Sequence, residues 1–251
     1  MTDADAPQWL PRADGLKLAI RHRNGRPDKP TIVFLPGYAS DMLGGKAVAL
    51  DAWAADQGYA MLRLDYSGCG ESEGAFADGT LAIWRDDALF AIEQLVKGPV
   101  LLVGSSMGGW IALLMAQALG TRAAALVGIA AAPDFTIWGF TDAEKATLQS
   151  EGKLLRPSDY GPEPMLTTLD LWQSGNDLLL LDRGIDFARP VRLLQGQSDD
   201  VVPWKIALRT AEALRSDDVQ VTLIKDGDHR LSRAADIDLL IGTVATLMEM
   251  M

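Results

Sequence analysis

The stretch LLVGSSMGG, residues 101–109, decides the fold of this chain of 251 residues. A short apolar run precedes its two serines, and an amphipathic run with helical spacing begins at Met107. This order predicts a buried strand, a sharp turn and a helix. Such a turn holds a serine hydroxyl clear of the sheet, where a general base and backbone N–H groups can reach it. The stretch therefore predicts a nucleophile at the end of a strand.

The spacing of the glycines selects one of the two serines. The pattern G-x-S-x-G needs small residues two positions before and two positions after the serine. Gly104 and Gly108 occupy these positions around Ser106, whereas the same frame centred on Ser105 would place valine and methionine there. Ser106 is therefore the candidate nucleophile. The alternative is a glycine-rich turn with a purely structural purpose.

Short apolar runs alternate with longer amphipathic runs on both sides of this turn. The alternation predicts an α/β fold, with a mostly parallel central sheet and helices on both faces. Because no repeat or linker divides the chain, we expect one domain over residues 1–251. The expected strands are 16–21, 31–35, 59–64, 100–103, 124–130, 191–194 and 219–224, and the expected helices are 45–57, 81–96, 107–119, 203–215 and 234–248.

The chain has two histidines, so the choice of a general base for Ser106 is narrow. His229 lies in a polar loop between an expected strand and the last expected helix, and it follows the serine and the candidate acid in chain order. His22 lies among basic residues before a turn, which favours a solvated surface histidine. We therefore expect His229 to be the base.

The acid that orients this histidine is expected in the loop after the strand 191–194. Two neighbouring aspartates compete for the role. The frame G-x-x-D-x-x-V-P, which runs from Gly196 to Pro203, places Asp199 at the acid position and leaves Asp200 as a cap or loop residue. Asp199 would orient His229 and stabilise its protonated form without taking the proton.

Two backbone amides are expected to hold the oxygen that becomes negative during acyl transfer. The first is the amide of Met107, directly after the nucleophile. The second is the amide of Tyr38, in the turn after the strand 31–35, where Gly37 permits a sharp bend. The alternative for this second loop is a turn that simply ends the strand.

Residues 134–186 interrupt the alternation of strands and helices. A loop this long is usually functional, and its position before the candidate acid predicts a small lid over the carboxyl ends of the strands. The alternative is a structural excursion that packs its tryptophans into the core. The residues expected to line an apolar acyl pocket near the lid and the nucleophile are Tyr38, Leu43, Trp110, Trp138, Phe140 and Trp172.

The composition argues against several partners and cofactors. Acidic residues outnumber basic ones by 34 to 23, and the net charge of −11 disfavours nucleic acid and anionic membranes. One cysteine and two histidines nearly exclude a zinc site. A carboxylate site for calcium or magnesium stays open, although no EF-hand pattern is present, and we expect no metal and no cofactor. Cys69 is expected to be a packed structural residue. The acidic first ten residues and the lack of a long apolar run predict a cytoplasmic protein without stable membrane insertion.

Five motifs together resemble one family. They are LPGY (35–38), RLDYSG (63–68), VGSSMGGW (103–110), DDVVPW (199–204) and DHR (228–230). Over nearly the whole chain the sequence resembles the palmitoyl-protein thioesterase family of α/β-hydrolase domain-containing protein ten. The resemblance implies an α/β-hydrolase fold and a triad of Ser106, Asp199 and His229. It also implies S-depalmitoylation of proteins and cleavage of acyl glucuronides as candidate activities.

The function expected from these residues is hydrolysis of a small-molecule ester or an acylated-protein thioester through an acyl-enzyme. A second hypothesis is a peptidase or lactonase on the same triad, because the fold does not set the substrate. A third is a non-catalytic ligand-binding protein that uses the same pocket. Such a protein usually lacks a member of the triad, whereas all three residue types are present here.

Overall fold

The computed structural model describes residues 6–157 and 164–251. The acidic residues 1–5 and residues 158–163 of the expected lid lie outside this description. The strands of the central sheet are β1 (Gln8–Pro11), β2 (Lys17–Arg23), β3 (Thr31–Leu35), β4 (Met61–Leu64), β5 (Val100–Ser105), β6 (Ala123–Ile129), β9 (Val191–Gly196) and β10 (Val219–Ile224). The helices that cover it are α1 (Gly45–Asp56), α2 (Leu81–Leu95), α3 (Met107–Leu119), α7 (Lys205–Ala213) and α8 (Ala234–Met250).

The eight strands follow the order β1-β2-β4-β3-β5-β6-β9-β10 across the sheet. From β4 to β10 all neighbours are parallel, whereas β2 pairs antiparallel with both β1 and β4. The strand β5, which leads to Ser106, lies between β3 and β6, near the middle of the sheet. The carboxyl ends of the parallel strands meet at one edge, which is where open α/β sheets bind ligands.

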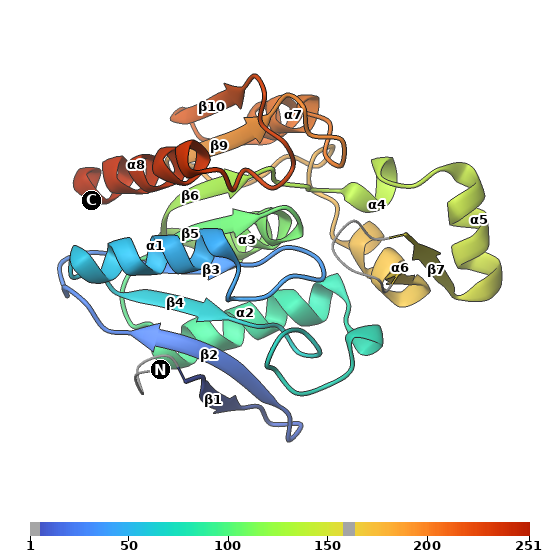
Figure 1. Ribbon diagram of the computed structural model, residues 1–251, viewed down its shortest axis with the longest axis horizontal. Helices are drawn as coiled ribbons and strands as arrows, with labels where there is room; N and C mark the ends of the chain where they lie inside the picture. Colours follow the sequence, from blue (N-terminus) through green and yellow to red (C-terminus); the bar gives the residue numbers. More distant parts are fainter. Residues whose placement is uncertain (1–5, 158–163) are drawn as a thin grey trace.

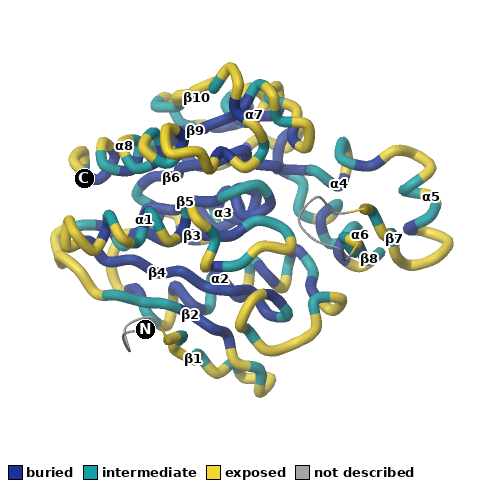
Figure 2. Tube along the Cα trace, in the orientation of Figure 1, coloured by how far each residue is buried: buried dark blue, intermediate teal, exposed yellow. Residues whose placement is uncertain are grey.

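Helices cover both faces of the sheet (Figure 1), with α1 and α8 on one face and α2 and α3 on the other. The residues of β3 alternate between these two layers. Ile32 and Phe34 pack in the apolar cluster that includes α1 and α8, while Val33 and Leu35 pack in the cluster that includes α2 and α3. Both faces are therefore dry, which explains why the parallel strands are continuous apolar runs. Figure 2 shows these central strands as buried.

The predicted α/β-hydrolase fold is confirmed, and the expected helix 107–119 coincides with α3. The other predicted covering helices and strands differ from the observed bounds by about two residues at most. The prediction missed β1, the short edge strand that pairs with β2. Most of its residues are exposed and it ends in Pro11, so it has neither the apolar run nor the alternation that marks a strand in sequence.

Residues 134–186 contain more regular structure than the sequence analysis expected. The elements are α4 (Phe135–Trp138), α5 (Asp142–Glu151), β7 (Lys153–Arg156), β8 (Met165–Thr168) and α6 (Leu169–Asp177), and β7 pairs antiparallel with β8. Figure 1 shows them beside the carboxyl ends of the parallel strands. Leu148 is the only buried residue of α5, so the helix lacks apolar periodicity. The sequence signal for the start of this helix was its capping box, formed by Thr141 and Glu144.

Asp134 connects the two ends of the segment 134–186. Its carboxylate accepts hydrogen bonds from the amides of Leu180 (2.9 Å) and Leu181 (2.8 Å), which lie 46 and 47 residues later in the chain. Burial raises the pKa of Asp134, and these two amides oppose that shift. The excursion therefore leaves and rejoins the core at one hydrogen-bonded point.

Candidate active site

Ser106 occupies the sharp turn between β5 and α3. Its backbone has φ 54° and ψ −120°, a conformation that residues other than glycine rarely adopt. Backbone hydrogen bonds connect it to the end of β6 and to the residues that follow: the amide of Ser106 donates to the carbonyl of Ile129 (2.9 Å), and its carbonyl accepts from the amide of Ala132 (3.0 Å). The end of β6 therefore stabilises the strained turn that presents the hydroxyl.

The two glycines of the motif are needed because backbone atoms lie where their side chains would be. A Cβ on Gly104 would lie 2.2 Å from the carbonyl oxygen of Gly108. A Cβ on Gly108 would lie 2.1 Å from the carbonyl oxygen of Leu35 and 2.4 Å from that of Pro36. Helix α3 therefore begins in direct contact with the loop that follows β3.

The structure brings together the three residues expected to form a triad. His229 Nε2 lies 3.2 Å from Ser106 Oγ, and His229 Nδ1 lies 2.9 Å from Asp199 Oδ2. The side chain of Asp199 is fully buried and that of His229 is 13% exposed. A neutral imidazole with its proton on Nδ1 would donate to Asp199 and accept from Ser106. This is the arrangement in which a histidine can remove the serine proton.

Three residues were the alternatives to this triad: His22 as the base, Asp200 as the acid and Ser105 as the nucleophile. His22 belongs to β2, opposite Leu62 of β4, and burial together with the charge of Arg23 lowers its pKa. Asp200 is exposed. Ser105 is the last residue of β5 and pairs with Ile129 of the neighbouring strand.

The carboxylate of Asp199 is held by hydrogen bonds on both of its oxygens. Oδ1 accepts from the amides of Val201 (2.9 Å) and Val202 (2.8 Å), and Oδ2 accepts from Gln195 Nε2 (2.9 Å) as well as from His229. Burial acts to raise the pKa of Asp199, but the hydrogen bond and charge of His229 and the two amides outweigh it, so the pKa is lowered. An ionised Asp199 can stabilise a protonated His229.

The loop after β3 lies against Ser106. A Cβ on Gly37 would lie 3.4 Å from Ser106 Cβ and 3.3 Å from the carbonyl oxygen of Ser105. Within the described residues, the amides of Tyr38 and Met107 make no backbone hydrogen bond. Both amides, which the sequence analysis expected to donate to an oxyanion, can therefore donate to an acceptor outside the backbone.

Arg63 and Asp65 hold the far part of this loop, a role that the sequence analysis missed. Asp65 Oδ1 accepts from the amide of Met42 (2.7 Å), and the guanidinium of Arg63 donates to the carbonyl of the same residue (2.9 Å). Both charged side chains are buried, and burial raises the pKa of Asp65. The available signal was a pair of opposite charges at the end of an apolar strand, where buried charges need partners.

The side chain of Tyr38 links this loop to the excursion. Its hydroxyl donates a hydrogen bond to the carbonyl of Leu166 in β8. Its ring lies 5.3 Å from that of Phe76 and 5.8 Å from that of Trp84, between centroids. Tyr38 therefore lies in the loop beside Ser106 while its side chain contacts the segment 134–186.

Two of the residues expected to line the acyl pocket, Trp110 and Phe140, are buried among other side chains. Trp110 is completely buried, donates from its indole nitrogen to the carbonyl of Leu178 (3.2 Å) and makes an edge contact with Phe135. Phe140 is buried beneath the guanidinium of Arg156, which lies 4.5 Å from its ring centroid. The sequence does not show which aromatic residues are buried, because aromatic residues occur both in cores and in pockets. A role for these two in substrate binding stays a prediction.

The other expected pocket residues retain exposed surface. Trp138 packs against a small apolar cluster of Ala132, Val202 and Ile206, of which Val202 lies in the loop that carries Asp199. Trp172 is partly exposed, and the indole N–H groups of both tryptophans donate to backbone carbonyls. Leu43, in the loop after β3, is 46% exposed. A role for these three side chains in substrate binding stays a prediction.

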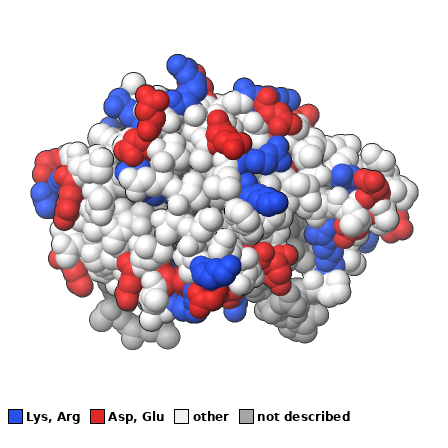
Figure 3. All heavy atoms as spheres, turned by 90° about the horizontal axis from the view of Figure 1, so that it is seen from above, with Lys and Arg blue, Asp and Glu red and all other residues white. Residues whose placement is uncertain are grey.

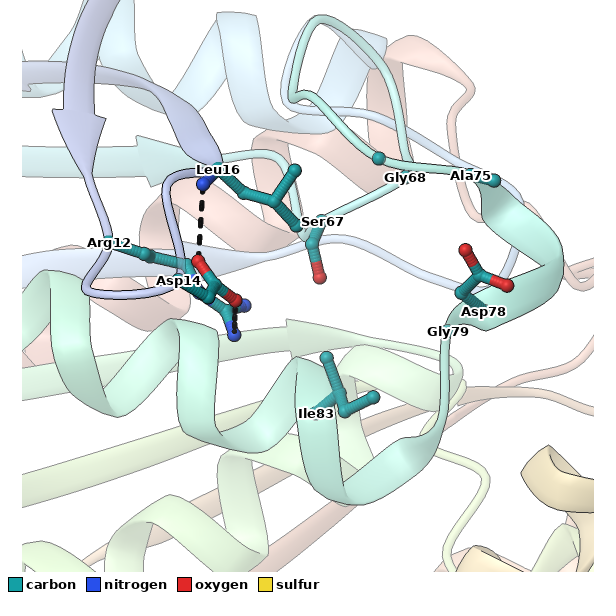
Figure 4. Close-up of a pocket in the computed structure, with 10 residues that line it drawn as sticks. Arg12, Asp14, Leu16, Ser67, Gly68, Ala75, Asp78, Gly79 and Ile83 are labelled. Atoms are coloured by element: carbon teal, nitrogen blue, oxygen red, sulfur yellow. Dashed lines mark hydrogen bonds and ion pairs between the residues drawn. The ribbon is translucent and has the colours of Figure 1, made fainter.

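A shallow pocket of about 120 Å³ lies apart from these residues, beside α2 and the turn between β1 and β2 (Figure 4). Arg12 and Asp14 face Asp78 across it. Arg12 forms ion pairs with both Asp14 (2.8 Å) and Asp87, so its charge is already balanced.

Charges of both signs are interspersed on the face shown in Figure 3. In the described part of the chain, no three His, Cys, Asp or Glu side chains gather in a way that could bind a metal ion. None of the helices described here is both long enough and apolar enough to span a bilayer.

Comparison with known proteins agrees with this geometry. The chain matches the alpha/beta hydrolase family over residues 32–243. It is 37% identical over 260 residues to the human protein named palmitoyl-protein thioesterase ABHD10, mitochondrial, and the alignment covers 97% of this chain and 84% of the human protein. The mouse protein of the same name is 38% identical over 245 residues, with 96% and 82% covered.

Solved structures extend the similarity to three dimensions. Alpha/beta hydrolase domain-containing protein 10 from mouse aligns with a TM-score of 0.90 at 37% identity, covering 97% of this chain and 98% of that one. Est1E from Butyrivibrio proteoclasticus, solved with ferulic acid, aligns with a TM-score of 0.79 at 19% identity and covers 96% and 97%. This second likeness concerns the fold alone.

The chain belongs to the α/β hydrolase family and, within it, to the family of ABHD10. The resemblance seen in the sequence motifs is thereby confirmed. The family and its relatives named as thioesterases support a hydrolase that acts on ester or thioester bonds. These relatives are named as mitochondrial, and the cytoplasmic location expected for this chain stays a prediction.

Proposed function

We propose that the protein is a serine hydrolase that cleaves carboxylic esters or thioesters through a Ser106–His229–Asp199 triad and an acyl-enzyme. One observation carries the proposal: a serine in a strained turn, a histidine 3.2 Å from its hydroxyl, and a buried carboxylate 2.9 Å from the other ring nitrogen. A structural turn would not require this chain of contacts from three separate loops.

The proposed reaction begins with attack of Ser106 Oγ on the acyl carbonyl carbon while His229 Nε2 takes the hydroxyl proton. The carbonyl oxygen becomes negative, and the amides of Tyr38 and Met107 donate to it. When the tetrahedral intermediate collapses, His229 returns the proton to the departing alcohol or thiol. Water then attacks the acyl-enzyme with His229 as base, and the acid product and free serine are released.

The substrate class we favour is an acyl chain on a thioester or ester, including acylated proteins and acyl glucuronides. Relatives named palmitoyl-protein thioesterase support a long acyl chain. The exposed apolar surface of Leu43, Trp138 and Trp172 contacts such a chain in this proposal. We further propose that residues 134–186 form a lid on a single α/β-hydrolase domain, since Tyr38 anchors them to the loop beside the nucleophile.

Two adjacent serines offer a matched test. Ser106→Ala should abolish turnover of a short p-nitrophenyl ester, while Ser105→Ala, one residue away, should retain most of it. A fluorophosphonate probe should label Ser106 in wild type and should not label Ser106→Ala. Unchanged turnover in Ser106→Ala would refute the assignment, and a folded wild type that neither turns over ester nor reacts with the probe would favour a non-catalytic binding protein.

A peptidase or lactonase on the same triad would be recognised by its substrates. We expect acyl esters and acyl-thioesters of increasing length to be hydrolysed faster than aminoacyl-arylamides and lactones. The reverse order of kcat/KM would move the assignment to one of those classes while leaving the triad in place.

A further inference from the structure

Gln195 is a buried polar residue that contacts the triad and that no motif brought to attention. It is the fifth residue of β9, four positions before Asp199, and its side chain is completely buried. Its nearest polar contact is Asp199 Oδ2, at 2.9 Å from Nε2, and weaker contacts reach the carbonyls of Gly196 (3.2 Å) and Val202 (3.3 Å). Gln195 therefore donates to the same carboxylate oxygen that receives the Nδ1 proton of His229.

The orientation of the Gln195 amide follows from its neighbours. All three polar contacts of Nε2 are oxygen acceptors, so exchanging the amide nitrogen and oxygen would set an oxygen lone pair against a carboxylate. Among the described residues, Oε1 has no hydrogen-bond partner. A buried unpaired oxygen is costly, and an apolar residue in this strand would avoid that cost. The hydrogen bond from Nε2 to Asp199 explains why a glutamine occupies this position despite that cost.

We propose that Gln195 is a positioning residue that fixes the carboxylate of Asp199, and through it the ring of His229, for the proposed hydrolase reaction. The two amides on Oδ1 define one side of the carboxylate, and Gln195 supplies the donor that turns Oδ2 toward His229 Nδ1. With Nδ1 protonated and bound, Nε2 stays unprotonated and faces Ser106. The catalytic consequence of this inference rests on the proposed function, whereas the contact between Gln195 and Asp199 is independent of it.

The test replaces Gln195 with methionine, which has similar length and no donor. We expect kcat for a short p-nitrophenyl ester to fall about tenfold, with KM within about twofold, because the substrate does not touch Gln195. Gln197→Met is the matched control: it makes the same change two residues away, on a partly exposed side chain. We expect the control to behave as wild type.

A second readout reports the positioning directly. The chain has two histidines, so nitrogen-15 labelling of histidine gives few NMR signals, and His22 serves as an internal reference. In wild type the Nδ1 proton of His229 should resonate at low field and exchange slowly. In Gln195→Met it should move upfield or broaden, with part of His229 changing to the Nε2-protonated tautomer. The control should keep the wild-type signal.

The outcomes separate the possible roles of Gln195. Wild-type kcat together with a wild-type Nδ1 signal in Gln195→Met would overturn the inference, and so would a lower kcat and lower melting temperature with an unchanged signal. If that variant does not fold, Gln195→Glu replaces it. Its carboxyl group can donate only while protonated, so its kcat/KM relative to wild type should fall as pH rises, and a constant ratio would overturn the inference.

Failure of the proposed function would look different. Wild-type protein whose esterase activity does not depend on Ser106 would remove the catalytic consequence of the inference. The NMR comparison of wild type with Gln195→Met would still decide whether Gln195 positions Asp199 and His229.

Discussion

Gly108→Ala is expected to damage catalysis far more than a glycine-to-alanine change ordinarily would. The added Cβ would lie 2.1 Å from the carbonyl oxygen of Leu35, and an ordinary contact begins near 3.4 Å. Helix α3 and the loop after β3 must therefore separate by about 1.3 Å, the difference between these two distances. Met107 lies on one side of the gap and Tyr38 on the other, so the two amides that we propose as oxyanion donors can no longer point at the same oxygen.

The magnitude follows from this displacement. Moving one oxyanion donor by about 1 Å costs on the order of a hundredfold in rate, which corresponds to about 2.7 kcal/mol of transition-state stabilisation. The clash should also cost about 1–3 kcal/mol of folding stability, as for an overpacked core. We therefore expect kcat for a short p-nitrophenyl ester to fall about a hundredfold in protein that remains folded.

The control is Gly242→Ala, in α8. A Cβ there meets nothing within 4 Å and the residue is exposed, so helix propensity alone predicts a gain of about 0.5–1 kcal/mol and unchanged kcat. Urea unfolding gives the stability of each variant, and ester hydrolysis gives kcat. A Gly108→Ala enzyme that is folded and within twofold of wild-type kcat would refute the reasoning about the loop and the helix.

Three further outcomes are expected. Asp199→Asn should lower kcat about 10³- to 10⁴-fold by disturbing the tautomer of His229. Asp200→Asn should leave kcat nearly unchanged, and steady-state kinetics of ester hydrolysis measures both variants. Tyr38→Phe keeps the ring and the amide but removes the hydrogen bond to Leu166, so stability in urea should fall by about 1 kcal/mol and limited proteolysis of residues 134–186 should speed up. Burial raises the pKa of the Cys69 thiol to about 12, so the folded protein should resist thiol reagents below pH 9 and lose stability as pH rises above it.

For each of these three predictions, one result would contradict it. Equal losses in the two aspartate variants would mean that the acid was assigned to the wrong residue. Tyr59 packs on the α1 side of the sheet, with its ring 5.5 Å from that of Trp53, so Tyr59→Phe should leave the proteolysis rate unchanged. Equal proteolysis rates in Tyr59→Phe and Tyr38→Phe would show that the Tyr38 hydroxyl does not anchor residues 134–186. Rapid labelling of Cys69 in native protein, at the rate seen in denaturing urea, would contradict its burial.

Local features of the site could be predicted from the sequence because they depend on short-range sterics. Gly104 and Gly108 mark a turn at which a Cβ would meet backbone, and that requirement is visible in five residues. The scarcity of histidine made His229 the candidate base without any structure. The parallel sheet followed from apolar runs, since strands covered on both faces need apolar side chains on both sides.

Contacts between distant segments could not be predicted in this way. The sequence could not separate the buried Trp110 from Trp138 beside the acid loop, because an aromatic residue looks the same in a core and in a pocket. Gln195 and Asp65 gave no usable pattern, since their importance depends on which buried group each one meets.

The sequence by itself determined the sharp turn at Ser106, the identity of the candidate base and the α/β order, because each depends on residues close together in the chain. Only the tertiary structure decided that Ser106 meets His229 across 123 residues and that Tyr38 meets Leu166 across 128. The physical reason is that side-chain chemistry and backbone sterics act over a few residues, whereas the packing of helices on the sheet decides which loops meet at the carboxyl ends of the strands.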